Sequence, residues 1–196
     1  YSMNNQFWIC YFNDPRGLGG DQLAMALSSL RLLYAYTGNE KIKENMKFIA
    51  EYYLTHGLSS SNAAWPDIPY PYNTFVYSGN YDGDMILGKD FTQPDKAGSF
   101  GIELLRLYKL NAKERYPNVT DKLYLQAAIN IANTLATHTK DGDADNSPLP
   151  FKVNAITGAL GVLKSYGQDG KIEGSSSYTT NWSGTLELFL ELLEMH

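Results

Sequence analysis

The sequence predicts an all-α protein built from repeated antiparallel helical hairpins, with long loops on one side. Five segments repeat apolar residues at spacings of three and four, which is the period of one helix face. Pairs of these segments match each other at a nearly constant offset, so the hairpin recurs along the chain. A long loop follows each hairpin at the same phase of the repeat, and we therefore expect both loops to emerge on one side of the helices.

The first hairpin is predicted between residues 21 and 56. Its first helix, over 21–36, has one apolar face, formed by Leu23, Leu27, Leu30 and Tyr34. Its second helix, which runs to about Thr55, has another, formed by Ile42, Met46, Ile49 and Tyr53. Thr37 and Glu40 stand at capping-box spacing at the start of the second helix, and Gly57 is a natural stop after it.

The second hairpin repeats this pattern, and a third copy begins at Ser183. Its helices, over 97–110 and around 124–135, carry matching apolar faces, formed by Phe100, Leu104 and Leu107 and by Tyr124, Ala128, Ile131 and Leu135. The last segment, 183–196, separates three leucines from three acids: Leu186, Leu190 and Leu193 from Glu187, Glu191 and Glu194. We predict one domain over 1–196, with units at 21–96, 97–182 and an incomplete 183–196. In the second long loop, residues 151–154 followed by Thr157 and Gly158 predict a short β-hairpin.

The composition excludes several classes of function. The 196 residues include 16 Lys and Arg against 21 Asp and Glu, which gives a net charge of −5. This mild acidity argues against nucleic acid or an anionic membrane as the partner, because both attract clustered basic residues. No apolar run reaches the roughly 20 residues of a membrane span, and the single Cys10 excludes an internal disulfide and a Cys-rich zinc site. The distinctive feature is the aromatic content of 13%.

Two hairpin motifs resemble the six-hairpin (α/α) toroid superfamily of carbohydrate-active enzymes. The first pairs Leu32-Leu33-Tyr34 with Phe48-Ile49-Ala50, and the second pairs Leu105-Arg106-Leu107-Tyr108 with Ala127-Ala128-Ile129-Asn130-Ile131-Ala132. Residues 95–99, 65–66, 149–151 and 154–158 also look like that group. The resemblance implies a glycosidase or polysaccharide lyase fold of which this chain holds about half. We therefore expect a partial toroid, completed by self-association or by a further segment of a longer chain.

Aromatic and polar side chains gather in the two long loops. A protein binds sugars by placing aromatic rings under their C–H faces and carboxylates or amides at their hydroxyls. The residues that we predict to bind substrate in this way are Trp65, Tyr70, Tyr72, Tyr81, Tyr178 and Trp182. The alternative for each ring is a structural role, in which it pins a long loop onto the helices.

Asp82-Gly83-Asp84 is the best local candidate for the carboxylates of glycoside hydrolysis. That reaction generally uses two carboxyl groups that flank the scissile bond. Gly83 lets the backbone turn, so both acids stay near the aromatic rings. We predict Asp82 and Asp84 as catalytic residues, with ordinary turn chemistry as the alternative. Glu103 is interpreted as a solvated helix position.

No cofactor is expected, and one acidic segment is weighed as a metal site. Asp141, Asp143 and Asp145 alternate like the first ligands of a calcium loop, but the EF-hand pattern then fails, so a solvated acidic turn is preferred over calcium. His56 and His138 each follow the second helix of a hairpin. Capping of the helix C-terminus is preferred there over catalysis.

We predict a carbohydrate-active protein, a glycoside hydrolase that acts on a poly- or oligosaccharide. The alternatives are a polysaccharide lyase and a non-catalytic helical-hairpin module that binds glycans or proteins. A terpenoid-type cyclase shares the helical layout but normally needs an Asp-rich helix motif, which the sequence lacks. A carbohydrate ligand favours an extracellular or periplasmic location, although the sequence shows no signal peptide.

Overall fold

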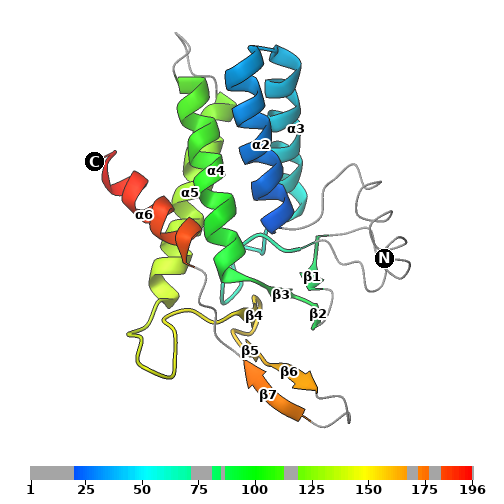
Figure 1. Ribbon diagram of the computed structural model, residues 1–196, viewed down its shortest axis with the longest axis vertical. Coiled ribbons are helices and arrows are strands. Elements are labelled where there is room, and N and C mark those ends of the chain that lie inside the picture. The colour runs from blue at the N-terminus through cyan, green and yellow to red at the C-terminus, as the bar shows by residue number, and fades with distance from the viewer. Residues whose placement is uncertain are drawn as a thin grey trace.

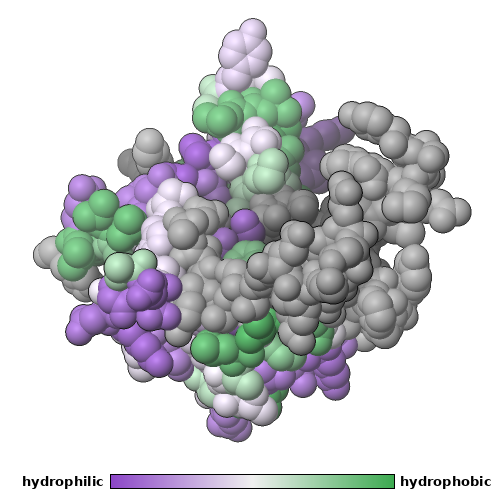
Figure 2. Space-filling view, turned by 60° about the horizontal axis from the view of Figure 1, so that its bottom comes forward, coloured by the Kyte–Doolittle hydropathy of each residue, from purple (hydrophilic) through white to green (hydrophobic). Residues whose placement is uncertain are grey.

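A computed structural model describes residues 20–71, 81–84, 87–112, 119–166, 172–176 and 182–195. These residues form five helices, and short strands gather at one end of the helices (Figure 1). None of the described helices is both long and apolar enough to cross a membrane. Figure 2 shows the strand end of the molecule, where hydrophobic and hydrophilic patches alternate over the described surface.

The first two helices form an antiparallel pair joined by a tight turn. They are α2 (Gly20–Thr37) and α3 (Glu40–His56). Gly38 makes the turn with a φ of 64°, a backbone conformation that favours glycine. The side chain of Asn39 caps α3 by accepting a hydrogen bond from the Lys41 amide at 3.0 Å. The predicted cap at Thr37 is therefore wrong. The Thr37 hydroxyl donates to the carbonyl of Leu33 and accepts the amide of Asn39 at 3.3 Å, and neither contact involves an amide within α3.

Helix α4 (Pro94–Ala112) is the centre of the helical layer. It packs against α2, α5 (Val119–His138) and α6 (Ser183–Leu193). The predicted apolar faces of α4 and α5 are buried, including Phe100, Leu104, Leu107, Tyr124 and Leu135. Helical periodicity therefore located these two elements and the sides they bury.

The predicted apolar face of the last helix is wrong. Leu186, Leu190 and Leu193 are exposed in α6, whereas Leu188 is fully buried against the core. The segment is rich in leucine on several sides, so spacing alone did not select the buried side. Contacts with α4, which are distant in sequence, decide it.

The two long connections carry short strands that the sequence analysis largely missed. The strands are β1 (Gly83–Asp84), β2 (Gly88–Lys89), β3 (Phe91–Thr92), β4 (Lys152–Asn154), β5 (Leu160–Gly161), β6 (Leu163–Tyr166) and β7 (Ile172–Ser176). In the described chain they form three antiparallel sheets, with the orders β1-β2, β3-β4-β5 and β6-β7. The predicted hairpin in the second connection is confirmed by the pairing of Val153 with Leu160.

The pairing of β3 with β4 joins the two long connections to each other. Phe91 pairs with Asn154 and Thr92 with Val153, and the amide of Trp65 donates to the carbonyl of Ala155 at 2.8 Å. The expectation that both connections lie on one side of the helices is therefore confirmed. Their backbone polar groups need partners, and short strands supply them.

The all-α prediction, a partial (α/α) toroid of repeated hairpins, is wrong. The described residues form a small mixed α/β fold, in which α4 lies among α2, α5 and α6 and small antiparallel sheets cover one end. The apparent repeat reflects two helical pairs with similar apolar spacing. Spacing of this kind fixes helix faces but not the arrangement of pairs in space.

Candidate functional site

Two adjoining hollows lie beside the C-terminal half of α5, and we call them together the α5 groove. The larger has a volume of about 510 Å³, and its wall on the helix side is made by Asn130, Asn133, Thr137 and His138. The smaller has a volume of about 230 Å³ and is lined in part by Trp65 and Lys140. The two hollows share Ala64, Thr137 and His138.

Helix α5 presents a polar stripe to the groove because of its sequence periodicity. Asn130, Asn133 and Thr137 recur at spacings of three and four, so they lie on one side of the helix. The apolar face that includes Ile131 and Leu135 is fully buried on another side. One helix thus supplies both core packing and a row of amide and hydroxyl groups.

The opposite wall of the groove is the segment that follows α3. The Thr134 hydroxyl of α5 donates to the carbonyl of Pro66 at 2.8 Å and attaches this segment to the helix. Asp67 follows with a φ of 57°, in the left-handed region that Asp tolerates better than most residues. The conformation brings Asp67 into the lining of the larger hollow.

His138 lies where the two hollows meet. Its Nδ1 is 2.8 Å from the carbonyl oxygen of Thr134. A carbonyl can only accept, so Nδ1 carries the hydrogen, and in the neutral ring Nε2 is an acceptor. His56 makes the same contact with the carbonyl of Tyr52 at 2.9 Å. Both histidines therefore cap the last turn of their helix, as the sequence analysis preferred.

Trp65 forms part of the wall of the smaller hollow. Its ring stacks on His138, with the centroids 4.0 Å apart and the planes at 20°. Only 4% of the residue is exposed, and Ser59 holds its carbonyl with a hydroxyl hydrogen bond of 2.6 Å. The ring pins a loop onto α5, which is the structural role considered for Trp65, and it also borders a hollow.

Of the other rings predicted to bind substrate, the three that the structure describes do not line the α5 groove. Tyr70 and Tyr81 are buried in the core, and Tyr81 lies 4.6 Å from Tyr53 between ring centroids. Trp182 is partly buried against the same core. Tyr72 and Tyr178 lie outside the described residues.

The two predicted catalytic acids lie in the β1 segment, away from the residues that line the α5 groove. Asp84 is buried and forms an ion pair of 2.7 Å with the buried Lys152. It also accepts hydrogen bonds from the Leu87 amide at 2.9 Å and from the Gln93 side chain at 3.2 Å. Removing either member of such a buried pair leaves an uncompensated charge. The pair attaches β1 to β4.

Asp82 differs from Asp84 in its surroundings. Its carbonyl accepts the amide of Asp90 at 2.7 Å. Its Oδ1 is buried and has no hydrogen-bond partner among the described residues. Burial of Tyr70 first, and then the negative charges of Asp90 and Asp82, raise the pKa of the Tyr70 hydroxyl.

The acidic segment that was weighed as a calcium site is a turn in this structure. Asp141, Asp143 and Asp145 are all exposed. Asp143 accepts hydrogen bonds from the Asp145 and Asn146 amides at 2.8 and 2.7 Å. The Asp145 amide first, and then Asn146, lower the pKa of the Asp143 carboxyl. The described residues contain no group of three His, Cys, Asp or Glu side chains that could hold a metal ion.

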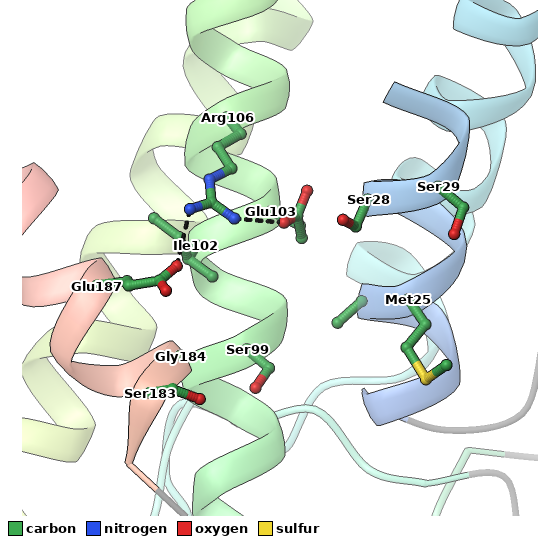
Figure 3. Close-up of a pocket in the computed structure, with 11 residues that line it drawn as sticks. Met25, Ser28, Ser29, Ser99, Ile102, Glu103, Arg106, Ser183, Gly184 and Glu187 are labelled. Atoms are coloured by element: carbon green, nitrogen blue, oxygen red, sulfur yellow. Dashed lines mark hydrogen bonds and ion pairs between the residues drawn. The ribbon is translucent and has the colours of Figure 1, made fainter. Parts of the chain in front are cut away.

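A separate hollow of about 290 Å³ lies between α2, α4 and α6 (Figure 3). Its floor holds Glu103, which is buried and contacts Arg106 at 2.7 Å and Arg31 at 3.3 Å. The interpretation of Glu103 as a solvated position is therefore wrong. Arg106 also contacts Glu187 of α6 at 2.7 Å. Burial acts to lower the pKa of Arg106, but the hydrogen bond and charge of Glu103, followed by Glu187, raise it overall.

Comparison of the chain with models of protein families, with curated proteins and with solved structures found no match. We therefore infer the function from the geometry of the α5 groove. The sequence analysis missed Asn130, Asn133 and Thr137 as groove residues. Their helical spacing predicts that they share one side of α5, but it does not predict that the segment after α3 lies opposite them.

Proposed function

We propose that this protein binds carbohydrate in the α5 groove. The observation that carries the proposal is the polar stripe of Asn130, Asn133 and Thr137 next to the stacked Trp65 and His138. Amide and hydroxyl groups can both donate and accept hydrogen bonds, as sugar hydroxyls do. The apolar edge of the smaller hollow suits the C–H surface of a sugar ring.

The charge of the groove favours a neutral hydroxylated ligand. Among the described lining residues, the charged side chains at neutral pH are Asp67 in the larger hollow and Lys140 in the smaller one. One acid and one base do not form the basic cluster that phosphate groups need. A poly- or oligosaccharide fits this lining better than a nucleotide does.

The binding test uses an exposed pair of stripe residues. We expect isothermal titration calorimetry with a panel of neutral and uronic oligosaccharides to detect binding. Substituting Asn133→Ala and Thr137→Ala together should raise Kd by roughly tenfold or more, since each lost hydrogen bond contributes about 1 kcal/mol. Asn45→Ala, at an exposed position of α3 away from the groove, is the matched control and should leave Kd unchanged.

Two results would count against binding in this groove. One is an absence of heat with every sugar of the panel at millimolar concentration. The other is binding that the paired substitution leaves unchanged while the protein stays folded by circular dichroism. Nuclear magnetic resonance shifts confined to residues outside the groove would support the second result.

Glycoside hydrolysis is the second candidate, and Asp67 favours it because this acid lines the larger hollow, where the proposed sugar would bind. Hydrolysis generally needs a second carboxyl group. Asp82 and Asp84 were predicted for this chemistry, but neither lines the groove, and the Lys152 pair would also have to open for Asp84 to serve. The test is incubation with the same panel of oligosaccharides and measurement of the reducing ends or unsaturated product released. Asp67→Asn, Asp82→Asn and Asp84→Asn should each lower this release if the acid they replace is catalytic. Binding without release leaves the binding proposal and removes the catalytic one.

A further inference from the structure

Two helices expose apolar stripes that no described element covers. The α6 stripe consists of Leu186, Leu190 and Leu193, which are 52%, 60% and 70% exposed. The α2 stripe consists of Met25, Leu32 and Tyr36, which are 67%, 61% and 90% exposed. Each set recurs at helical spacing and so runs along one side of its helix. Exposed apolar residues aligned on one side of a helix mark an interaction site more often than scattered single residues do.

The two stripes lie on either side of the same helix. Both α2 and α6 pack against α4, and the hollow above Glu103 and Arg106 separates them (Figure 3). Leu27 of α2 and Leu188 of α6 are the buried contacts on the opposite sides of these helices. The stripes therefore lie on the sides of α2 and α6 away from these buried contacts, and Met25 also lines the hollow between the two helices.

The two helices differ in charge. All the charged side chains of α6 are acidic, namely Glu187, Glu191 and, directly after the helix, Glu194. Helix α2 carries one acid, Asp21, and one base, Arg31, which already pairs with Glu103 of its own chain at 3.3 Å. Pairing α6 with a second α6 would place carboxylates near carboxylates. Pairing α6 with α2 avoids this repulsion, because one acid and one base leave α2 without an excess of negative charge.

We propose that a second copy of this chain covers the stripes, with α2 of each copy packed on α6 of the other. Each copy contributes both stripes, so a twofold axis satisfies both contacts at once and the assembly closes as a dimer. The six stripe residues offer on the order of 700 Å² per copy, close to the roughly 800 Å² that each partner buries in a standard interface. The dimer is independent of the carbohydrate proposal, because the α5 groove shares no lining residue with the stripes.

Sedimentation velocity over a range of concentrations gives the first test. The wild-type protein should be a dimer at roughly 100 µM and dissociate on dilution. Leu32 and Leu190 are the central residues of their stripes. Leu32→Lys and Leu190→Glu should therefore each weaken the dimer by roughly 100-fold, because each places a charge in an apolar contact. Leu123→Lys, at a position of α5 that is 56% exposed and outside both stripes, is the matched control and should remain dimeric.

The double variant Leu32→Lys with Leu190→Glu identifies which helices meet. When α2 packs on α6 of the other copy, each new Lys lies close to a new Glu, and dimerisation should recover by roughly tenfold or more over either single variant. When α6 meets α6, or α2 meets α2, the double variant sets like charges together and stays monomeric. All three positions are exposed, so circular dichroism should show folded protein throughout.

The proposal is overturned by a wild-type protein that is monomeric at roughly 100 µM, which would assign the stripes to a different occupant. It is also overturned if the double variant fails to recover. A loss of dimer in Leu123→Lys as large as in the stripe variants would equally contradict it.

Discussion

Tyr70 shows how burial and neighbouring charges combine at a single residue. Its side chain is buried, its amide donates to the carbonyl of Gly57 at 2.7 Å, and its carbonyl accepts the hydroxyl of Tyr53. Burial first, and then the negative charges of Asp90 and Asp82, disfavour the ionised phenolate. Together they raise the pKa of Tyr70 to about 12.

This raised pKa predicts a loss of stability at high pH. The unfolded chain titrates its tyrosines near pH 10, so between about pH 10 and 12 the folded state holds a proton that the unfolded state has released. The contribution is fully present below pH 10 and disappears as pH rises toward 12. Urea unfolding at pH 8, 10 and 11.5 should show a falling free energy of unfolding.

Tyr70→Phe is the control for this pH dependence. The variant cannot ionise at position 70, so its free energy of unfolding should fall less steeply between pH 10 and 11.5. Absorbance titration of phenolate should also lose one late component relative to the wild type. Identical pH profiles for the two proteins would contradict the assignment to Tyr70.

At the scale of elements, the crossing of α4 and α6 depends on two glycines. A Cβ at Gly98 would lie 2.7 Å from the backbone nitrogen of Thr185, and a Cβ at Gly184 would lie 2.6 Å from the Cα of Ser99. The dipeptides Gly98-Ser99 and Gly184-Thr185 are alike in sequence, with a glycine followed by a small hydroxyl residue. The structure sets these two dipeptides against each other, so each glycine admits the backbone of the other helix.

Gly98→Ala should therefore destabilise the protein. The methyl group meets backbone atoms of α6 that cannot move independently, and overpacking of this kind costs about 1–3 kcal/mol. The better helix propensity of Ala offsets roughly 1 kcal/mol of that cost. Urea unfolding measures the net change. Ser29→Ala, at an exposed position of α2, should change stability by less than about 0.5 kcal/mol. A Gly98→Ala variant that is more stable than the wild type would show that the crossing is not tight, because only the gain in helix propensity would then remain.

At the scale of the whole molecule, local periodicity predicted the helices, whereas the strands and the groove depend on contacts between residues distant in sequence. Tyr124, Ala128, Ile131 and Leu135 are all fully buried, because a helix of regular spacing has one consistent inner face. Strands of two residues, such as β1 and β3, are too short to show an alternating pattern. The groove likewise needs Trp65 and His138, which are distant in sequence, to stack.

The same distinction between local and long-range contacts predicts two levels of stability within the protein. Helix α4 is enclosed by α2, α5 and α6, whereas β6 and β7 pair with each other and no other described element packs on them to a similar extent. An isolated two-stranded ribbon is marginally stable in water. Amides of β6 and β7 should therefore exchange with deuterium at least roughly 100-fold faster than those in the middle of α4, by local opening rather than global unfolding.

Low concentrations of urea separate these two modes of exchange in a mass-spectrometric measurement. Global unfolding exposes much surface, so urea below the unfolding midpoint should accelerate exchange in the middle of α4. Local opening of β6 and β7 exposes little surface, so their exchange should respond weakly to urea.

Leu104→Ala removes a fully buried side chain from α4 and should cost about 2–5 kcal/mol of the free energy of unfolding. It should therefore accelerate exchange in α4 while leaving the ribbon almost unchanged. Equal acceleration of both regions would mean that the ribbon belongs to the same cooperative unit as the helices.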